Sequence, residues 1–144
     1  MVLKTILKHK PPGFISVHAE MLVGNVVDLL AQKNIGAVLV VENDELIGIL
    51  SERDVVRSLS TRPNATLNLT AGALMTRNPT IASPETTVER ALEIMTNGHF
   101  RHLPVVEQGR LIGLVSIGDV VKARIDQSQH EVDSLRTYVA GPAL

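Results

Sequence analysis

Two seven-residue stretches decide the fold of this chain: Gly48-Ile49-Leu50-Ser51-Glu52-Arg53-Asp54 and Gly113-Leu114-Val115-Ser116-Ile117-Gly118-Asp119. They share a glycine, two apolar residues, a serine and an aspartate, in the same order and at an offset of 65 residues. The apolar residues are typical of a buried strand, and serine is a preferred residue at the start of a helix. Each stretch therefore predicts a strand that ends where a helix begins.

The same offset holds well beyond these stretches. Residues 15–57 align on residues 80–122 without a gap, and the identities fall in clusters. Each copy predicts an extended segment, a helix, two short apolar strands joined by a polar turn, and a second helix. The expected ranges are 14–17, 20–30, 37–41, 46–50 and 52–59 in the first copy, and 80–82, 84–95, 103–106, 111–115 and 117–125 in the second.

One β-α-β-β-α unit is too small to bury its own sheet face well, so two copies are expected to bury each other. The predicted fold class is therefore α/β (α+β), with tandem repeats packed around a pseudo-twofold axis. We assign residues 1–60 to the first repeat, 61–68 to a polar linker, 69–126 to the second repeat and 127–144 to a C-terminal helix or tail. Short helical leaders are expected at 2–7 and 69–75.

Residues 122–139 predict a continuation of the last helix. Ile125, Val132, Leu135 and Val139 form an apolar stripe that Ser128 interrupts. Two interpretations remain open at this point: the helix packs back on its own repeat, or it contacts a second copy of the chain.

Composition narrows the function classes. The chain is 44% hydrophobic but only 2% aromatic, carries a formal net charge of −1 and contains no cysteine. Few aromatic residues and no basic excess argue against nucleic-acid binding. The missing cysteines exclude disulfides, thiolate metal sites and cysteine nucleophiles. With neither an apolar run near 18 residues nor a signal-peptide pattern, we expect a cytoplasmic protein without a membrane segment.

The Ser–Asp stretches also suggest chemistry. A helix N-terminus that follows a strand can hold a phosphate, and an aspartate one turn into the helix can accept hydrogen bonds from the two hydroxyls of a ribose. In a single copy, serine and aspartate at these positions would more often only cap the helix. Their recurrence at the same offset favours ligand binding.

The repeats, the Ser–Asp stretches and the run Phe100-Arg101-His102-Leu103-Pro104-Val105-Val106 resemble a CBS domain pair, also called a Bateman module, over residues 2–125. The chain is similar to stand-alone bacterial CBS-pair proteins. The resemblance implies a regulatory protein without catalysis, which binds AMP, ADP, ATP, NAD(H) or S-adenosylmethionine. AMP is the leading candidate, and binding would change a homodimer or the activity of an unknown regulated protein.

The resemblance also implies that each binding site mixes the two copies, with the Ser and Asp from one and the remaining residues from the other. Site A would use Ile49, Ser51, Arg53, Asp54, Asn78, Thr80, Arg101 and His102, with backbone near Thr80 and Phe100 reading the adenine. Site B would use Leu114, Ser116, Gly118, Asp119, Ile15, Ile35, Gly36 and Ala37. Pro104, within the quoted run, is also assigned to nucleotide binding.

The two sites are not equivalent. Arg101 and His102 stand where the first copy has Gly36 and Ala37, so site A is expected to hold a phosphorylated ligand more tightly. Lys10 could approach site B. The alternatives are a structural dimerisation module without ligands and a nucleotide hydrolase or transferase, for which no nucleophile, metal set or Walker-type loop is present. His99 and His102 alone do not make a metal site, and none is expected.

Overall fold

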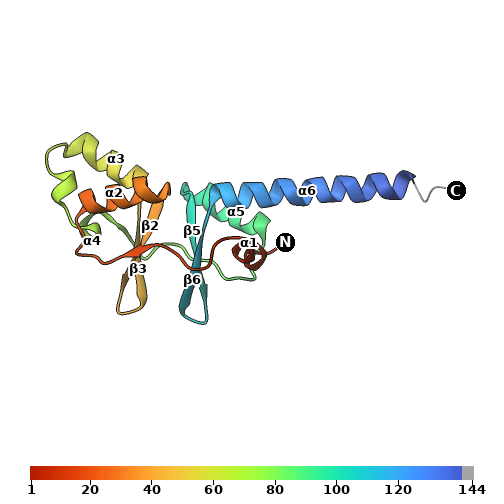
Figure 1. Cartoon of the computed structure of the whole chain (residues 1–144), viewed down its shortest axis with the longest axis horizontal. Helices are drawn as coiled ribbons and strands as arrows, with labels where there is room; N and C mark the ends of the chain where they lie inside the picture. Colours follow the sequence, from red (N-terminus) through yellow and green to blue (C-terminus); the bar gives the residue numbers. More distant parts are fainter. Residues whose placement is uncertain (141–144) are drawn as a thin grey trace.

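The computed structural model describes residues 1–140. Two lobes stand side by side, their hairpins point in the same direction, and the last helix leaves the body as a long arm (Figure 1). The predicted β-α-β-β-α order is confirmed, with two additional short elements between the repeats. The elements are α1 Leu3–Lys8, β1 Ser16–Val17, α2 Val23–Lys33, β2 Ala37–Glu42, β3 Glu45–Ser51, α3 Glu52–Thr61, η1 Thr66–Asn68, α4 Ala71–Leu74, β4 Thr76–Arg77, α5 Val88–Gly98, β5 His102–Glu107, β6 Arg110–Ser116 and α6 Ile117–Ala140.

The first helix of each repeat begins three residues later than predicted. Its N-caps are Leu22 in α2 and Thr87 in α5, and the Thr87 hydroxyl accepts a hydrogen bond from the amide of Arg90 at 3.1 Å. Both helices end at a left-handed residue, Asn34 (φ 53°) and His99 (φ 58°), which stand at equivalent positions of the repeat. Each C-cap turns the chain towards the following strand.

The two sheets differ at one edge. The first has the order β1-β2-β3-β4, with β1 parallel to β2 and the other neighbours antiparallel. The second has β5 and β6 paired antiparallel, and its expected extended segment is reduced to a parallel bridge between Ala82 and Val105. The connection that could supply an equivalent of β4 to β6 contains Pro11 and Pro12, which have no amide hydrogen to donate.

The leader helices are exchanged between the lobes. Leu3 and Ile6 of α1 belong to the core formed by the second repeat, whereas Ala71 of α4 and Met75 belong to the core formed by the first. Matching backbone bonds hold both leaders, from the amide of Val88 to the carbonyl of Met1 (3.0 Å), and from Val23 to Leu69 (2.8 Å). The two repeats are therefore interlocked, a feature that the boundaries expected from sequence do not show.

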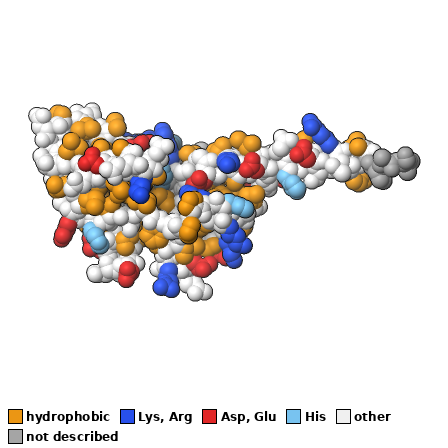
Figure 2. Space-filling model, in the orientation of Figure 1, with side chains coloured by type: hydrophobic (Ala, Val, Ile, Leu, Met, Phe, Trp, Pro, Cys, Tyr) orange, Lys and Arg blue, Asp and Glu red, His pale blue; other side chains and the backbone are white. Residues whose placement is uncertain are grey.

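Helix α6 is a single helix that runs from the second lobe to Ala140. Val120 and Ala123 bury its first turns against the lobe, but every residue from Gln129 to Ala140 is exposed. Figure 2 shows this arm extending well beyond the body. The arm does not pack back on its own lobe as far as Ala140, and residues 141–144 of the expected tail lie outside the described residues. Between Met1 and Ala140 no helix is long and apolar enough to cross a membrane.

Candidate functional site

The first Ser–Asp stretch forms a capping box at the start of α3. The Asp54 carboxylate (Oδ2) accepts from the Ser51 amide at 2.9 Å, and the Ser51 hydroxyl accepts from the Asp54 amide at 3.3 Å. The Gly36 carbonyl accepts from the Glu52 amide at 2.9 Å. Of the first three amides of α3, only that of Arg53 has no partner among residues 1–140, so one donor and the Oδ1 oxygen of Asp54 are available to a ligand.

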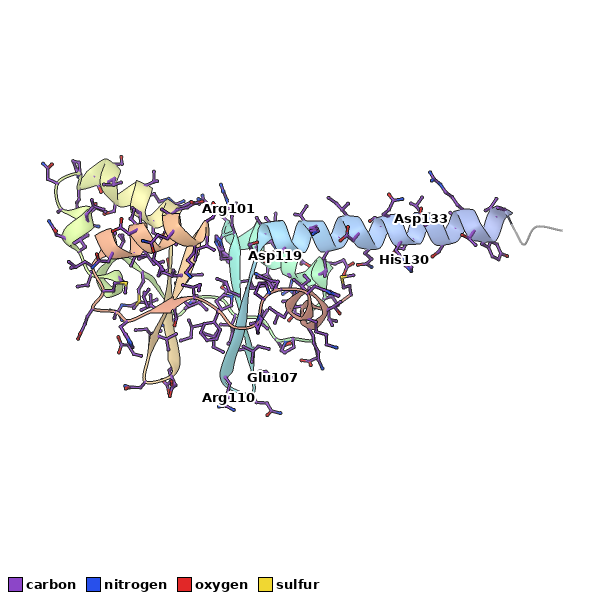
Figure 3. All side chains as sticks on the ribbon, in the orientation of Figure 1. Arg101, Glu107, Arg110, Asp119, His130 and Asp133 are labelled. Atoms are coloured by element: carbon purple, nitrogen blue, oxygen red, sulfur yellow. The ribbon has the colours of Figure 1, made fainter. Side chains whose placement is uncertain are left out.

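The second stretch repeats this arrangement at the start of α6. The Ser116 amide donates to Asp119 Oδ2 at 2.9 Å, and the Asp119 amide donates to the Ser116 hydroxyl at 3.1 Å. The Ile117 amide donates to the Arg101 carbonyl at 2.7 Å, as Glu52 does to Gly36. Figure 3 shows Arg101 and Asp119 at the end of the second lobe that lies opposite the hairpin tip, where Glu107 and Arg110 are labelled.

All the residues predicted for site A lie together. They line a cavity of about 290 Å³ between the lobes, which both repeats form. Arg53 reaches across it and donates to the His99 carbonyl at 3.3 Å. Three guanidinium groups and two carboxylates border the cavity, so its charge suits an anion. The lining residues that sequence reasoning did not assign to the site are Glu52, Arg57, Thr76, Pro79, Gly98 and His99, besides the backbone contact at Phe100.

Arg57 could have been found from the sequence. It follows Arg53 by four residues, so both side chains lie on one face of α3. Thr76 could not have been found in this way, because it reaches the cavity only through the pairing of β4 with β3, where it stands opposite Ile49.

Site B is a larger cavity of about 550 Å³, within the usual range of about 300–1,000 Å³ for ligand pockets. Seven of its eight predicted residues line it; Gly118 does not, and lies exposed in the first turn of α6. Lys10 also lines the cavity, as expected, and donates to Asp119 at 2.7 Å and to the Leu114 carbonyl at 2.9 Å. The residues that were not predicted are Pro11, Pro12, Gly13, Phe14 and Asn34.

The wall of site B that was not predicted comes from a longer connection. The backbone bonds that hold the leaders are related by 68 residues, from Met1 to Leu69, whereas the repeats are related by 65. The segment between α1 and β1 is therefore three residues longer than its counterpart after α4. It carries Lys10, the two prolines and Phe14 over the opening of the second cavity.

The sites share His102, which lines both cavities. A Cβ atom added at Gly36 would lie 3.3 Å from the imidazole, so the glycine permits this close approach between the lobes. Burial lowers the pKa of His102 below its ordinary value of 6.5, although Glu52 and Asp119 act in the opposite direction. The imidazole is therefore mainly neutral near pH 7, and the sequence-based expectation of a protonated donor needs a nearby anion.

Burial alone would raise the pKa of Asp119. The hydrogen bonds from Lys10 and Ser116 outweigh it and lower the pKa below its ordinary value. Asp119 is therefore a carboxylate at neutral pH that already has a cationic partner.

Pro104 lies apart from both cavities. It is buried in β5 opposite Leu114, and its carbonyl accepts from the Ala82 amide at 2.9 Å. Its position is explained by the parallel bridge of the second sheet, because a proline there leaves only an acceptor to be satisfied. No group of three or more His, Asp or Glu side chains gathers in metal-binding geometry within residues 1–140.

Comparison with solved structures agrees with this architecture. The CBS-domain protein ATU1752 from Agrobacterium tumefaciens is 38% identical, with a TM-score of 0.83 over 86% of this chain and 99% of that one. CBSX2, solved in complex with AMP, is 26% identical, with a TM-score of 0.73 over 88% and 98%. The CBS domain pair of protein MJ0100, solved with 5′-methylthioadenosine and S-adenosyl-L-methionine, is 25% identical, with a TM-score of 0.76 over 88% and 98%.

The chain spans about three fifths of the length of the first curated relatives that it matches. CBSX3, a mitochondrial CBS domain-containing protein from Arabidopsis thaliana, is 36% identical over 122 residues, which are 81% of this chain and 59% of that protein. The model of the CBS domain family matches residues 5–61 and again residues 71–126. With two matches that correspond to the two lobes, the chain belongs to the CBS domain family and contains a tandem pair of CBS domains.

Proposed function

We propose that this CBS pair is a regulatory module that binds an adenine nucleotide between its lobes and acts without catalysis. The observation that carries the proposal is the pair of Ser–Asp capping boxes, each at the edge of a cavity that both repeats line. Each capping box leaves one helix amide and one carboxylate oxygen for a ligand. Relatives solved with AMP and with S-adenosylmethionine support the class of ligand.

AMP is the leading ligand, with ADP, ATP, NAD(H) and S-adenosylmethionine as the other candidates. At site A, Asp54 would accept the ribose hydroxyls, and the Arg53 amide with the Arg101 and Arg57 guanidinium groups would bind the phosphate. Backbone near Thr80 and Phe100 would read the adenine. The binding roles of Ile49, Asn78 and the site B residues remain part of this proposal.

The sites are proposed to differ in affinity for phosphate. Site A has three arginines on its border, whereas site B has Lys10, which is already paired with Asp119. We therefore expect AMP to occupy site A first. Site B, with the larger cavity and small neutral residues such as Gly36 and Ala37, would hold AMP more weakly or admit a bulkier ligand. Equal affinities in a two-site calorimetric titration would contradict this asymmetry.

The experiment that tests ligand binding is a thermal-shift panel of AMP, ADP, ATP, NAD(H) and S-adenosylmethionine. A ligand at 100 times its dissociation constant stabilises the folded protein by about 2.7 kcal/mol. The matched control is the double variant D54N/D119N, in which each amide oxygen can still accept the capping bond but the negative charge is lost. No stabilisation by any ligand would favour the alternative, a structural dimerisation module, and release of phosphate from ATP would indicate an enzyme.

A homodimer in the cytoplasm that controls another protein completes the proposal. Its assembly is tested by sedimentation and its location by microscopy of a tagged chain. Nucleic-acid binding stays disfavoured by the net charge of −1.

A further inference from the structure

The arm of α6 carries an apolar seam that the rest of the described chain leaves uncovered. Its positions alternate at spacings of four and three residues, which keeps them on one side of a helix. Leu135 is 63% exposed and Val139 is 75% exposed. The seam consists of Val121, Ile125, Ser128, Val132, Leu135 and Val139.

An isolated arm with this sequence would be a poor helix in water. Every residue from Gln129 to Ala140 is exposed, so no tertiary packing supports these last turns. Helices of about 12 residues without such packing are marginal even for favourable sequences. Both the helix and its apolar seam therefore require a partner.

We propose that the seam pairs α6 with α6 of a second copy of the chain in a parallel, two-stranded coiled coil. Ile125, Val132 and Val139 take the a positions of the heptad, and Leu135 takes a d position together with Val121 and Ser128. β-Branched residues at a with leucine at d favour two parallel strands over higher oligomers.

The flanking charges select a second copy and the parallel direction. In a parallel pair, a g residue faces the e residue of the next heptad on the other helix. Glu131 at g then faces the partner's Arg136 at e, and the twofold axis repeats the pair. Arg124 at g faces the partner's Gln129, so these contacts bring no like charges together. The surface is self-complementary, as a twofold interface requires.

The seam is continuous with the lobe. Val121 is 41% exposed and Ile125 is 61% exposed, beside the turn in which Val120 and Ala123 hold α6 against the second lobe. The coiled coil would therefore begin at the body and fix two CBS pairs side by side in the same orientation. This inference does not depend on whether the cavities bind nucleotides.

A cysteine experiment tests the direction and register. The chain has no cysteine, so one introduced thiol can react only with the same position of another copy. In a parallel coiled coil, position 128 faces itself across the axis, so S128C should form a disulfide-linked dimer under mild oxidation. H130C is the matched control, because His130 lies on the opposite side of the arm from the seam (Figure 3). Cross-linking of S128C no faster than H130C would overturn the proposal.

A charge reversal gives a second and independent test. E131R or R136E alone should weaken the dimer about fivefold in sedimentation, from the loss of two symmetric ion pairs and the new repulsion. The double variant E131R/R136E should restore it. Equal dissociation constants for all four proteins would contradict parallel pairing.

The variant L135D should abolish the dimer while leaving the lobes folded. Its thermal-shift response to the nucleotide panel should match that of the parent chain, which separates this proposal from the nucleotide proposal. A dimer that persists in L135D would place the interface elsewhere and overturn the coiled coil.

Discussion

The Nζ atom of Lys10 lies 2.7 Å from Oδ2 of Asp119. Lys10 comes from the connection that precedes the first repeat, whereas Asp119 caps the last helix of the second. The equivalent carboxylate of site A, Asp54, forms no ion pair within residues 1–140. A ribose that enters site B must therefore share or displace Lys10, while one that enters site A meets an unpaired aspartate.

Replacement of Lys10 by methionine should raise the pKa of Asp119 towards its ordinary value. The lowered pKa of Asp119 contributes stability that is present above about pH 3.9, the value in an unfolded chain, and is lost as the pH falls through the lower folded value. K10M should therefore unfold at a higher pH on acidification. NMR titration of the Asp119 carboxyl carbon measures the shift directly.

The effect on stability at neutral pH should be small. Both side chains are partly exposed, and such pairs contribute about 0–1 kcal/mol. K8M is the matched control, because Lys8 carries the same charge in α1 but forms no salt bridge with a described residue. An unchanged Asp119 titration in K10M would show that the pair does not form in solution.

Asp54 should be needed for binding more than for folding. D54A removes both the capping bond to Ser51 and the proposed ribose acceptor, whereas D54N can keep the cap. Hydrogen bonds to a charged group are worth about 1.5–3 kcal/mol, so D54A should weaken AMP by about one to two orders of magnitude at site A. Calorimetry measures the affinity and urea unfolding measures the stability.

The D54N variant separates the two roles. It should retain most of the stability of the parent chain and still bind AMP more weakly. Full affinity in D54N would mean that Asp54 serves only as a helix cap.

Gly48 and Gly113 form a matched pair of leader contacts. From the sequence, each could be a position of ligand approach or a tight strand end. A Cβ atom at Gly48 would lie 2.3 Å from the Met75 sulfur and 2.9 Å from the Thr76 carbonyl oxygen, and one at Gly113 would lie 2.7 Å from a Leu7 methyl. The glycines therefore make room for the leader segments that precede the repeats.

Substitution of the two glycines by alanine should have unequal costs. The clash in G48A includes backbone, which cannot move aside, so we expect a loss of about 1–3 kcal/mol. The clash in G113A involves the end of a flexible side chain and should cost less. Urea unfolding gives both values, and an equal loss in the two variants would contradict this account of the leaders.

The duplication made most of the fold predictable. Two copies of Ser–x–x–Asp after an apolar strand predicted the strand ends, the helix starts and the residues that line site A. Agreement between the copies turned a weak local signal into a strong one, because a capping serine alone is common at helix starts.

The remainder depended on contacts between segments that are distant in the sequence. The exchange of α1 and α4 could not be read from the chain, because the same apolar pattern would suit packing on either lobe. Thr76 reaches its cavity through strand pairing. Pro104 was assigned with its neighbours, but alternation along β5 turns it away from the site and into the sheet interior.

His102 should take up a proton when a phosphorylated ligand binds. Burial lowers its pKa below 6.5, Lys10 and Arg101 lower it further, and Glu52 and Asp119 oppose them. A phosphate in either cavity adds negative charge beside the imidazole and raises its pKa. At pH 6.5, AMP should therefore bind with proton uptake and adenosine without it. Calorimetry in two buffers with different ionisation enthalpies measures the number of protons.

The variant H102Q tests the same residue without ligand. Because the folded pKa of His102 is lowered, the unfolded chain takes up its proton first as the pH falls, so stability should drop below about pH 6.5 and level off below the folded value. H102Q should remove this slope and the proton uptake together, because glutamine keeps a hydrogen-bond donor but does not titrate. If the slope persists in H102Q, another group controls it, and if AMP still binds with proton uptake, the phosphate lies away from His102.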